Sequence, residues 1–458
     1  MPQDLTRLFF PRSVTVVGAS TRADSVGGAV WRNLREGGFA GELSGVNPRG
    51  KGAGIVPDLD RLPGPPDLAV LAIPAGAALA AVETLLARGT RAFAILSGGF
   101  GERDAAGAER QRRLSALCTE HGAVLLGPNC MGLHVARPGF VLHAGFAQPR
   151  PEPGPAAVIS QSGSMAEWCV RRLASRGVGV SLTVSLGNTA GVGAADLLAA
   201  VSVHLPEVRT TALYLESPRE ARAAAGAAVL ANPAAVALLG GTSPAGAAAA
   251  GYHTGNREGP ARAGFPTASS LSTVASPGAW VDLIELSVRA PSPKGTRVAV
   301  VTNAGGPAIL AVDAFVDASA PRFSQALQAV LAGLAPPGAA LGNPLDLLAT
   351  AGPGHYARTI PALAASGEVD ALLIVFMHPR FTAPGPVATA IGAALDAVDL
   401  PAVVCWMSEE AGVTGVLRGR GATVVADPRR AAQALDRWLA DGARGGSRAS
   451  GGEPPGRA

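Results

Sequence analysis

Hydrophobic positions along the chain form short runs rich in valine, isoleucine, leucine and alanine. Each run is followed by glycine or serine and then by a longer stretch rich in alanine, leucine and arginine. Short continuous apolar runs are typical of strands buried on both faces of a parallel sheet, and the longer stretches have helical composition. The pattern therefore predicts repeated strand–helix units of the α/β class. The predicted strands are Ser13–Val17, Glu42–Val46, Leu68–Ile73, Arg91–Leu96, Val124–Leu126, Ala156–Ser160, Val180–Val184, Thr210–Leu215, Ala234–Leu238, Arg297–Thr302, Ala371–Phe376, Ala402–Trp406 and Ala422–Val425.

Two proline-rich segments, Gln148–Pro155 and Ala290–Gly295, divide this series of strands. Prolines deny backbone donors to a sheet, so we expect both segments to be linkers. They give three α/β domains, residues 1–150, 155–290 and 295–440, in agreement with a prior of roughly 150 residues per domain. Residues 441–458 carry almost no apolar side chains and are expected to be disordered.

The composition excludes several classes of protein. Of the 458 residues, 48% are hydrophobic and 16% are charged, which indicates a globular chain. The formal net charge of +4 is spread along the chain and aromatic residues make up only 4%, so a nucleic-acid surface is not expected. Met1–Phe10 lacks the charged and apolar regions of a signal peptide, and no apolar run reaches the ~18 residues of a membrane span. We therefore expect a cytoplasmic protein that does not enter a membrane.

Lysine and cysteine usage narrows the possible chemistry. Lysine occurs only at Lys51 and Lys294, so the chain has no Walker-type phosphate loop and almost no candidate for a Schiff-base lysine. The cysteines lie far apart and form no C-x-x-C pair, so neither a metal site nor a disulfide framework is expected. They are Cys118, Cys130, Cys169 and Cys405, and Cys130 is expected to be buried packing rather than a nucleophile.

Glycine and polar residues follow the first two predicted strands. The residues concerned are Gly18, Ala19 and Ser20, and then Asn47, Pro48 and Arg49. A glycine turn that opens a helix can hold a phosphate on backbone N–H groups, with Arg49 or Lys51 supplying charge. The full G-x-G-x-x-G spacing is missing, and no acidic residue ends the second strand, as an NAD ribose would require. The residues alone leave open a nucleotide-type ligand or a bare tight turn.

Similar polar loops follow later strands. Ser97–Glu102 and Gly127–Gly132, the latter containing Asn129, have the composition of ordinary turns as well as of binding loops. In the second domain Ser162 and Gly163 stand between a strand and a helix, where hydroxyls and free N–H groups could hold phosphate or where Ser162 could simply cap the helix.

A possible acid–base pair lies further along the second domain. Glu216 leaves an apolar strand, and His253 lies in a segment of small residues expected to be a loop. A carboxylate that holds one ring N–H of a histidine leaves the other nitrogen free to accept a phosphoryl group. An isolated pair so far apart in sequence is more often unrelated than functional.

Taken in order, the motifs resemble the α subunit of nucleoside-diphosphate-forming acyl-CoA synthetases, with ADP-forming acetyl-CoA synthetase nearer than succinyl-CoA synthetase. The resemblance covers residues 5 to 440. The motifs that carry it are LFFPRSVTVVGAS, VNPRG, DLAVLAIPA, LSGGFGE, LLGPNCMG, VISQSGSM, SLGN, LYLES, YHTG, VAVVTNAGGP and GNPLD.

The resemblance implies a Rossmann-like CoA-binding domain followed by two flavodoxin-like domains. It implies that CoA or acyl-CoA is held by Gly18, Ala19, Ser20, Asn47, Pro48, Arg49, Ile73 and Pro74. It further implies phosphate at Ser162 and Gly163, Asn129 near the thioester, a phosphorylated His253 and Glu216 beside it. ADP or ATP with Mg²⁺ would be held by an ATP-grasp β subunit, in a heterotetramer of two α and two β chains.

The sequence departs from the family around His253. Leu239–Thr242 replaces a Lys-Ser-Gly-Arg type of strand end, and no basic residue lies between Arg222 and His253. Two functions follow: the catalytic α subunit of an ADP-forming acyl-CoA synthetase, or a CoA-binding regulatory paralogue that no longer transfers phosphate. An NAD-dependent dehydrogenase is disfavoured because the ribose-binding acid is missing.

Overall fold

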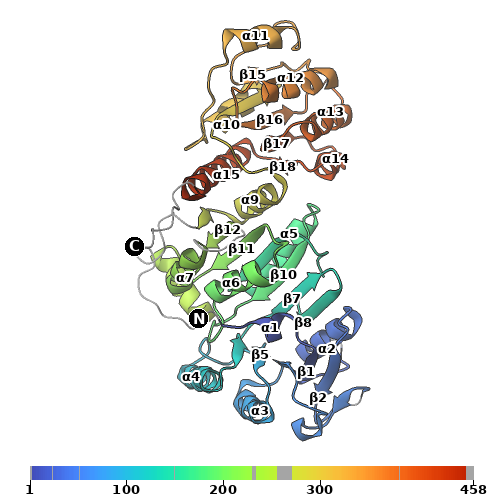
Figure 1. Ribbon diagram of the computed structural model, residues 1–458, viewed down its shortest axis with the longest axis vertical. Coiled ribbons are helices and arrows are strands. Elements are labelled where there is room, and N and C mark those ends of the chain that lie inside the picture. Colours follow the sequence, from blue (N-terminus) through green and yellow to red (C-terminus); the bar gives the residue numbers. More distant parts are fainter. Residues whose placement is uncertain are drawn as a thin grey trace, which may run out of the picture. The chain divides into compact units, whose positions relative to one another are not determined.

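The computed structural model describes residues 3–22, 24–50, 52–148, 150–228, 234–254, 271–380 and 382–449, without the side chains of 252–254 and 444–449. These residues form three sheets (Figure 1). The chain divides into two compact units, Met1–Pro277 with the first two sheets and Gly278–Ala458 with the third. The α/β class expected from the sequence is confirmed.

The first sheet has six parallel strands in the order β3-β2-β1-β4-β5-β6. This is the strand order of a Rossmann fold, in which ligands bind where the order reverses, beyond the carboxyl ends of the strands. The reversal lies between β1 and β4. The strands are β1 (Ser13–Val17), β2 (Glu42–Val46), β3 (Ile55–Val56), β4 (Leu68–Leu71), β5 (Ala92–Ile95) and β6 (Val124–Leu126). The helices are α1 (Thr6–Phe9), α2 (Val26–Glu36), α3 (Ala75–Arg88) and α4 (Ala105–Glu120), with a short 3-10 helix at Leu59–Arg61.

Alternation along β1 explains why this sheet is covered on both faces. Val14 and Val16 belong to the same buried cluster as Trp31 of α2, whereas Val17 belongs to the cluster that contains Leu85 of α3. Successive side chains of a strand point to opposite faces, so one apolar run supplies both clusters.

The second sheet has the order β13-β12-β11-β9-β10-β7-β8. Strands β9 to β13 are parallel in the flavodoxin order, and the hairpin β7–β8 adds two antiparallel strands beside β10. The strands are β7 (Gly132–Arg137), β8 (Phe140–Gly145), β9 (Ala156–Ser160), β10 (Val180–Ser185), β11 (Thr210–Leu215), β12 (Ala234–Leu239) and β13 (Ser272–Val274). The helices are α5 (Gly163–Ala174), α6 (Ala194–His204), α7 (Pro218–Ala228) and α8 (Pro244–Thr254). The hairpin comes from residues placed in the first domain by the sequence, yet its hydrogen bonds join it to the second sheet.

The third sheet, β15-β14-β16-β17-β18, is parallel and repeats the flavodoxin order. Its strands are β14 (Val298–Thr302), β15 (Leu345–Asp346), β16 (Ala371–Met377), β17 (Ala402–Met407) and β18 (Thr423–Val425). Its helices are α9 (Pro277–Arg289), α10 (Gly305–Val312), α11 (Gln325–Ala332), α12 (Pro353–Ala365), α13 (Pro384–Asp396), α14 (Val413–Gly419) and α15 (Pro428–Ala449).

Helix α9 packs with this third sheet, although the sequence analysis placed its residues in the second domain. Its fully buried Asp282 contacts Arg430 of α15 at 2.5 Å, and its fully buried Glu285 contacts Arg418 of α14 at 3.1 Å. Buried carboxylates need such partners, so these ion pairs tie α9 to the C-terminal unit.

The expected disorder from residue 441 onward is wrong for residues 441–449, because α15 continues through Ala449. Asp441 contacts Arg437 at 3.4 Å, one turn earlier on the helix. A Cβ at Gly442 would lie 2.2 Å from Cγ of Pro293, so the glycine lets the helix pack closely on the preceding linker. Low apolar content did not prevent helix formation here.

Among the described residues, no helix has the length and apolar character needed to cross a membrane.

The hairpin β7–β8 carries two buried histidines. His134 and His143 are paired across the two strands, with ring centroids 5.0 Å apart. Burial lowers the pKa of His134 to about 4 and that of His143 to about 3, with smaller contributions from the nearby Arg150. Both rings are therefore neutral at physiological pH.

This pair predicts an acid-sensitive fold. The folded pKa values lie below the unfolded value near 6.5, so the unfolded chain binds these protons more tightly, and stability is lost as pH falls from about 6.5 towards 4. The loss reaches roughly 3 kcal/mol for His134. We expect His143→Met to lose less stability than the wild type between pH 7 and pH 4.5 in urea denaturation. Equal losses in the two proteins would contradict this role.

Candidate functional site

The loop after β1 is held by two close contacts. Gly18 has φ +95°, and a Cβ at this position would lie 2.4 Å from the carbonyl oxygen of Ala72, so only glycine fits. Asn47 donates from Nδ2 to the carbonyl oxygen of Ala19 at 2.7 Å, which joins the loops after β1 and β2. The candidate CoA residues after β1 and β2 thus form one connected surface.

The loop after β4 completes this surface. Ile73 and Pro74 follow β4, and Pro74 precedes the first turn of α3. The hydroxyl of Ser97, after β5, donates to the carbonyl oxygen of Ile73. Strands β2, β1, β4 and β5 are neighbours, so the eight residues that the family resemblance assigned to CoA lie along one edge of the sheet, at its topological switch point.

The candidate phosphate loop opens helix α5. Ser162 is its N-cap residue and accepts weakly from the N–H of Met165 at 3.5 Å, while its hydroxyl lies 3.0 Å from that of Ser164. Helix capping and phosphate binding, the two roles considered for Ser162, are therefore compatible with this position of its side chain. A Cβ at Gly163 would lie 2.3 Å from Sδ of Met131, so Gly163 lets this loop contact the loop that carries Asn129.

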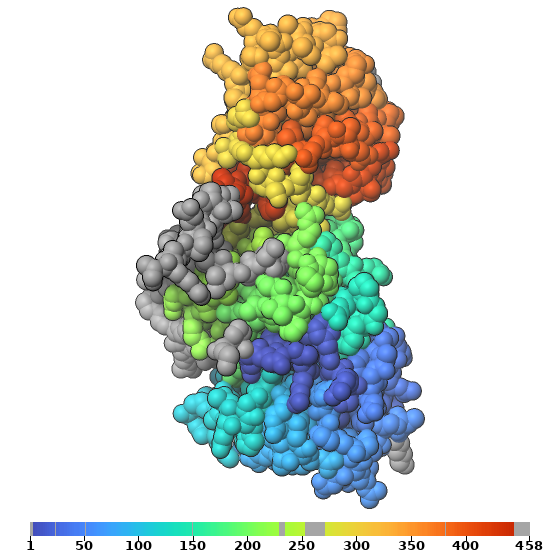
Figure 2. Space-filling view, in the orientation of Figure 1, coloured from blue at the N-terminus to red at the C-terminus, as the bar shows by residue number. Residues whose placement is uncertain are grey.

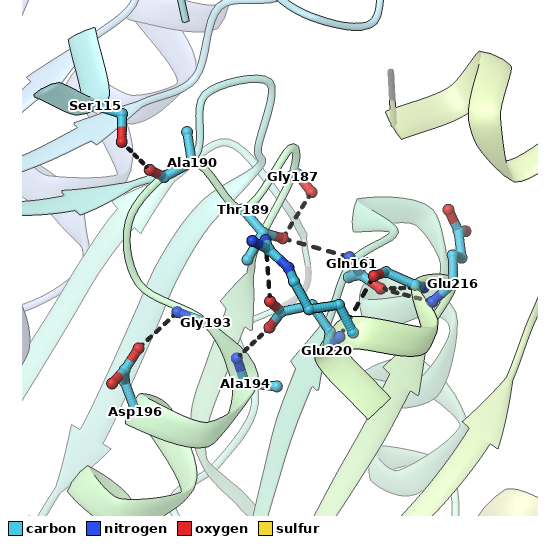
Figure 3. A network of polar contacts seen from close by, with 12 residues as sticks. Ser115, Gln161, Gly187, Thr189, Ala190, Gly193, Ala194, Asp196, Glu216 and Glu220 are labelled. Carbon is cyan, nitrogen blue, oxygen red and sulfur yellow. Dashed lines mark hydrogen bonds and ion pairs between the residues drawn. The ribbon is translucent and has the colours of Figure 1, made fainter. Parts of the chain in front are cut away.

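Gln161 joins the ends of β9 and β11 (Figure 3). Its Oε1 accepts from the backbone N–H groups of Glu216 at 2.6 Å and Ser217 at 3.1 Å, and its Nε2 donates to Thr189 at 3.4 Å. Gln161 is buried, so these bonds are shielded from water. The flavodoxin-type switch point lies between β9 and β11, which places Glu216 beside the phosphate loop.

Tyr214 supports the Glu216 side chain. Strand residues two apart point to the same face, and the Tyr214 hydroxyl donates to the Glu216 carboxylate. Burial, together with the charge of Glu216 and this hydrogen bond, raises the pKa of Tyr214 to about 12. A Cβ at Gly240 would lie 2.7 Å from the Tyr214 hydroxyl oxygen, so the departure from the family pattern at this position accommodates the tyrosine.

The backbone of His253 lies in helix α8, where the sequence analysis expected a loop. Its side chain, like all of residues 255–270, lies outside the described part of the chain. A Cβ at Gly241 would lie 3.2 Å from the carbonyl oxygen of Glu216 and 3.4 Å from Cβ of Ala250, one turn before His253. The end of β11 and helix α8 are thus close, and the pairing of Glu216 with His253 stays a prediction.

A chain of side-chain amides connects Asn129 to Glu102. Asn129 donates to Oδ1 of Asn188 at 3.2 Å, and Nδ2 of Asn188 donates to Glu102 at 2.6 Å and to Gln111 at 2.9 Å. A Cβ at Gly187 would lie 2.3 Å from the carbonyl oxygen of Pro128, which shows how tightly the two loops meet. The network joins loops of the first and second sheets around Asn129.

The carboxylate of Glu102 is the charged end of this network. Burial alone would raise its pKa, but hydrogen bonds from Asn188 and from the N–H groups of Gly99 and Phe100 outweigh burial and lower it. Glu102 is therefore ionised at neutral pH and accepts hydrogen bonds only. This fixes the orientation of the Asn188 amide, and through it that of Asn129.

The sequence analysis identified these loops but missed four of their supporting side chains, Gln161, Asn188, Glu102 and Tyr214. For Tyr214 a signal existed, because it lies on β11 two residues before Glu216, which directly follows the strand. The other three act across separate strand ends, which spacing along the chain does not reveal. In the part of the chain that the structure describes, no group of three or more His, Cys, Asp or Glu residues is placed to hold a metal ion.

Comparisons with known proteins agree with this architecture. Residues 12–136 match the CoA binding domain model, and residues 153–264 match the succinyl-CoA ligase like flavodoxin domain. The structure of this chain has a TM-score of 0.85 with a solved structure of acetyl-coenzyme A synthetase 1 from Candidatus Korarchaeum cryptofilum in complex with phosphate and ADP. That match covers 98% of this chain and 100% of the other at 26% identity.

Two curated relatives identify the family to which the chain belongs. The α subunit of ADP-forming acetate–CoA ligase II from Pyrococcus furiosus is 30% identical over 85% of this chain and 86% of its own length. ADP-forming acetate–CoA ligase I from Archaeoglobus fulgidus is 29% identical over 94% of this chain, which spans 63% of that relative. The chain therefore belongs to the nucleoside-diphosphate-forming acyl-CoA synthetase family, among the relatives of the α subunits of ADP-forming acetate–CoA ligases.

Proposed function

We propose that this chain is the α subunit of an ADP-forming acyl-CoA synthetase that interconverts acyl-CoA, ADP and phosphate with the free acid, CoA and ATP. The observation that carries the proposal is the hydrogen bond that Gln161 accepts from the backbone N–H of Glu216. It brings a helix N-terminus suited to an anion and a carboxylate together at one switch point. Such a pairing suits transfer of a phosphoryl group from a bound phosphate to a histidine.

CoA or acyl-CoA would bind along the edge formed by Gly18, Ala19, Ser20, Asn47, Pro48, Arg49, Ile73 and Pro74. The close backbone approach at Gly18, beside the N-terminus of α2, favours a phosphate-bearing ligand there. The match of residues 12–136 to a CoA binding domain supports this assignment.

The first chemical step would take place at the start of α5. A phosphate held by Ser162, Gly163 and the helix N-terminus attacks the thioester carbonyl carbon. The C–S bond breaks, CoA leaves as the thiol after taking a proton, and an acyl phosphate remains. Asn129, whose amide donates to Asn188, would use its second N–H to donate to the carbonyl oxygen as negative charge develops on it.

The second step would transfer the phosphoryl group to His253. A ring nitrogen attacks phosphorus, the P–O bond to the acyl group breaks, and the free carboxylate leaves. Glu216, held by Gln161 and Tyr214, accepts a hydrogen bond from the other ring nitrogen and stabilises the imidazolium that forms. Closure of the site against water favours transfer over hydrolysis.

The nucleotide would bind outside these 458 residues. Relatives of similar length are named α subunits, which supports a partner chain, and we propose an ATP-grasp β subunit in a heterotetramer of two α and two β chains. ADP or ATP would bind there with Mg²⁺, whose charge neutralises phosphate oxygens during transfer. We further propose that the protein acts in the cytoplasm on small-molecule acyl substrates.

Formation of phosphohistidine tests this function. We expect the purified chain, given acetyl-CoA, radiolabelled phosphate and Mg²⁺, to acquire an acid-labile, base-stable label, because the acyl phosphate formed at α5 passes its phosphoryl group to His253. His253→Ala should abolish the label, and His121→Ala, on the exposed end of α4, should keep it. Label that persists in His253→Ala, or no label even with a β subunit added, would contradict the proposal.

A mutant cycle tests the support of Glu216. Removing the Tyr214 hydroxyl in Tyr214→Phe should slow labelling about tenfold, the typical worth of a hydrogen bond to a charged group. In a Glu216→Ala background the same change should add little, because its partner is gone. Tyr356→Phe is the matched control and should leave the rate unchanged. Additive effects of Tyr214→Phe and Glu216→Ala would show that the two side chains act independently.

A further inference from the structure

A polar pocket of about 340 Å³ lies between the loop after β1 and helix α2. Ser20 and Thr21 form its wall on the loop side. The helix contributes Gly28, Trp31, Arg32, Arg35 and Glu36, which share one face because residues three and four apart are neighbours on a helix. The sequence analysis assigned only Ser20 of these residues to a ligand.

The pocket has an excess of positive charge. Arg32 and Arg35 contribute two guanidinium groups against the single carboxylate of Glu36. Within the described ranges neither arginine forms an ion pair, whereas Arg22, in the adjoining loop, contacts Asp24 at 2.8 Å. Arg35 lies over the Trp31 ring at 5.9 Å and is otherwise exposed. Both guanidinium groups are therefore available to an anion.

A buried tryptophan, Trp31, borders the same pocket. Trp31 is only 4% exposed, and its Nε1–H has no hydrogen-bond partner among the residues that the structure describes. The six-membered ring lies against the backbone of Gly45 in β2 and of Gly54 just before β3, since a Cβ at these positions would lie 3.2 Å or 3.4 Å from its carbons. The indole cannot turn away to find another partner. The Trp31 ring therefore forms a fixed wall of the pocket, with the Arg35 guanidinium above it.

We propose that this pocket binds a phosphate group at the nucleotide end of CoA, with Arg32 and Arg35 as its charge partners. The inference rests on the proposed CoA binding, and Ser20 connects the pocket to the loop that would hold the rest of the cofactor. Guanidinium groups bind phosphate oxygens through two parallel N–H donors, a geometry that a lone backbone loop lacks. CoA carries a 3′-phosphate and a 5′-diphosphate, and either group fits this chemistry.

Calorimetric titration of the full chain with CoA and with dephospho-CoA tests the assignment. We expect Arg32→Gln and Arg35→Gln each to raise the Kd for CoA at least about tenfold. Arg113→Gln, on the exposed face of α4, is the matched control and should stay within about twofold of the wild type. An unchanged melting temperature shows that each variant is folded.

Dephospho-CoA distinguishes the two phosphate sources. If only CoA binding weakens, the pocket holds the 3′-phosphate, and if both ligands weaken alike, it holds the 5′-diphosphate. CoA affinities within about twofold of the wild type in both arginine variants would overturn this inference and leave the proposed function intact. Failure of the wild-type chain to bind CoA would overturn both.

Discussion

The site depends on one constraint, the hydrogen bonds that Gln161 accepts from the backbone where β9 and β11 end. At a topological switch point the connections leaving two neighbouring strands turn to opposite faces of the sheet, which opens a crevice between them. The Gln161 side chain crosses that crevice and accepts from Glu216 and Ser217. Glu216 is therefore held next to the start of α5 by buried backbone groups, and its position does not depend on a flexible surface side chain.

The rest of the site is built by close contact between loops of two sheets. Gly187 and Gly163 lie where a Cβ would overlap the loop that carries Asn129, so glycine at these positions is required by packing. Hydrogen bonds from Asn129 through Asn188 to the ionised Glu102 then set the direction of each amide. Loops of the first sheet thus contribute to the candidate site beside the second sheet, and the two sheets belong to one compact unit.

Much of this fold could be predicted from the sequence. The runs at 13–17, 42–46, 124–126, 156–160 and 210–215 agree residue for residue with strands, because apolar runs bounded by glycine and serine leave few alternatives. The hairpin β7–β8 was missed although Pro138 and Gly139 mark its turn, and the helical residues 441–449 were taken as disordered. Helix α9 belongs to the C-terminal unit because its buried carboxylates pair with arginines more than a hundred residues away in the sequence. Gln161, Asn188 and Glu102 were missed for the same reason, because their partners are distant in sequence.

The most direct measurement of this arrangement is a crystal structure of the chain grown with inorganic phosphate. We expect the anion at the N-terminus of α5, within about 3 Å of the Ser162 hydroxyl and of a free N–H group of the first turn, on the side of the crevice that faces Glu216. Phosphate bound only elsewhere, with the helix start hydrated, would contradict the claim that the Gln161 link assembles a phosphoryl-transfer site.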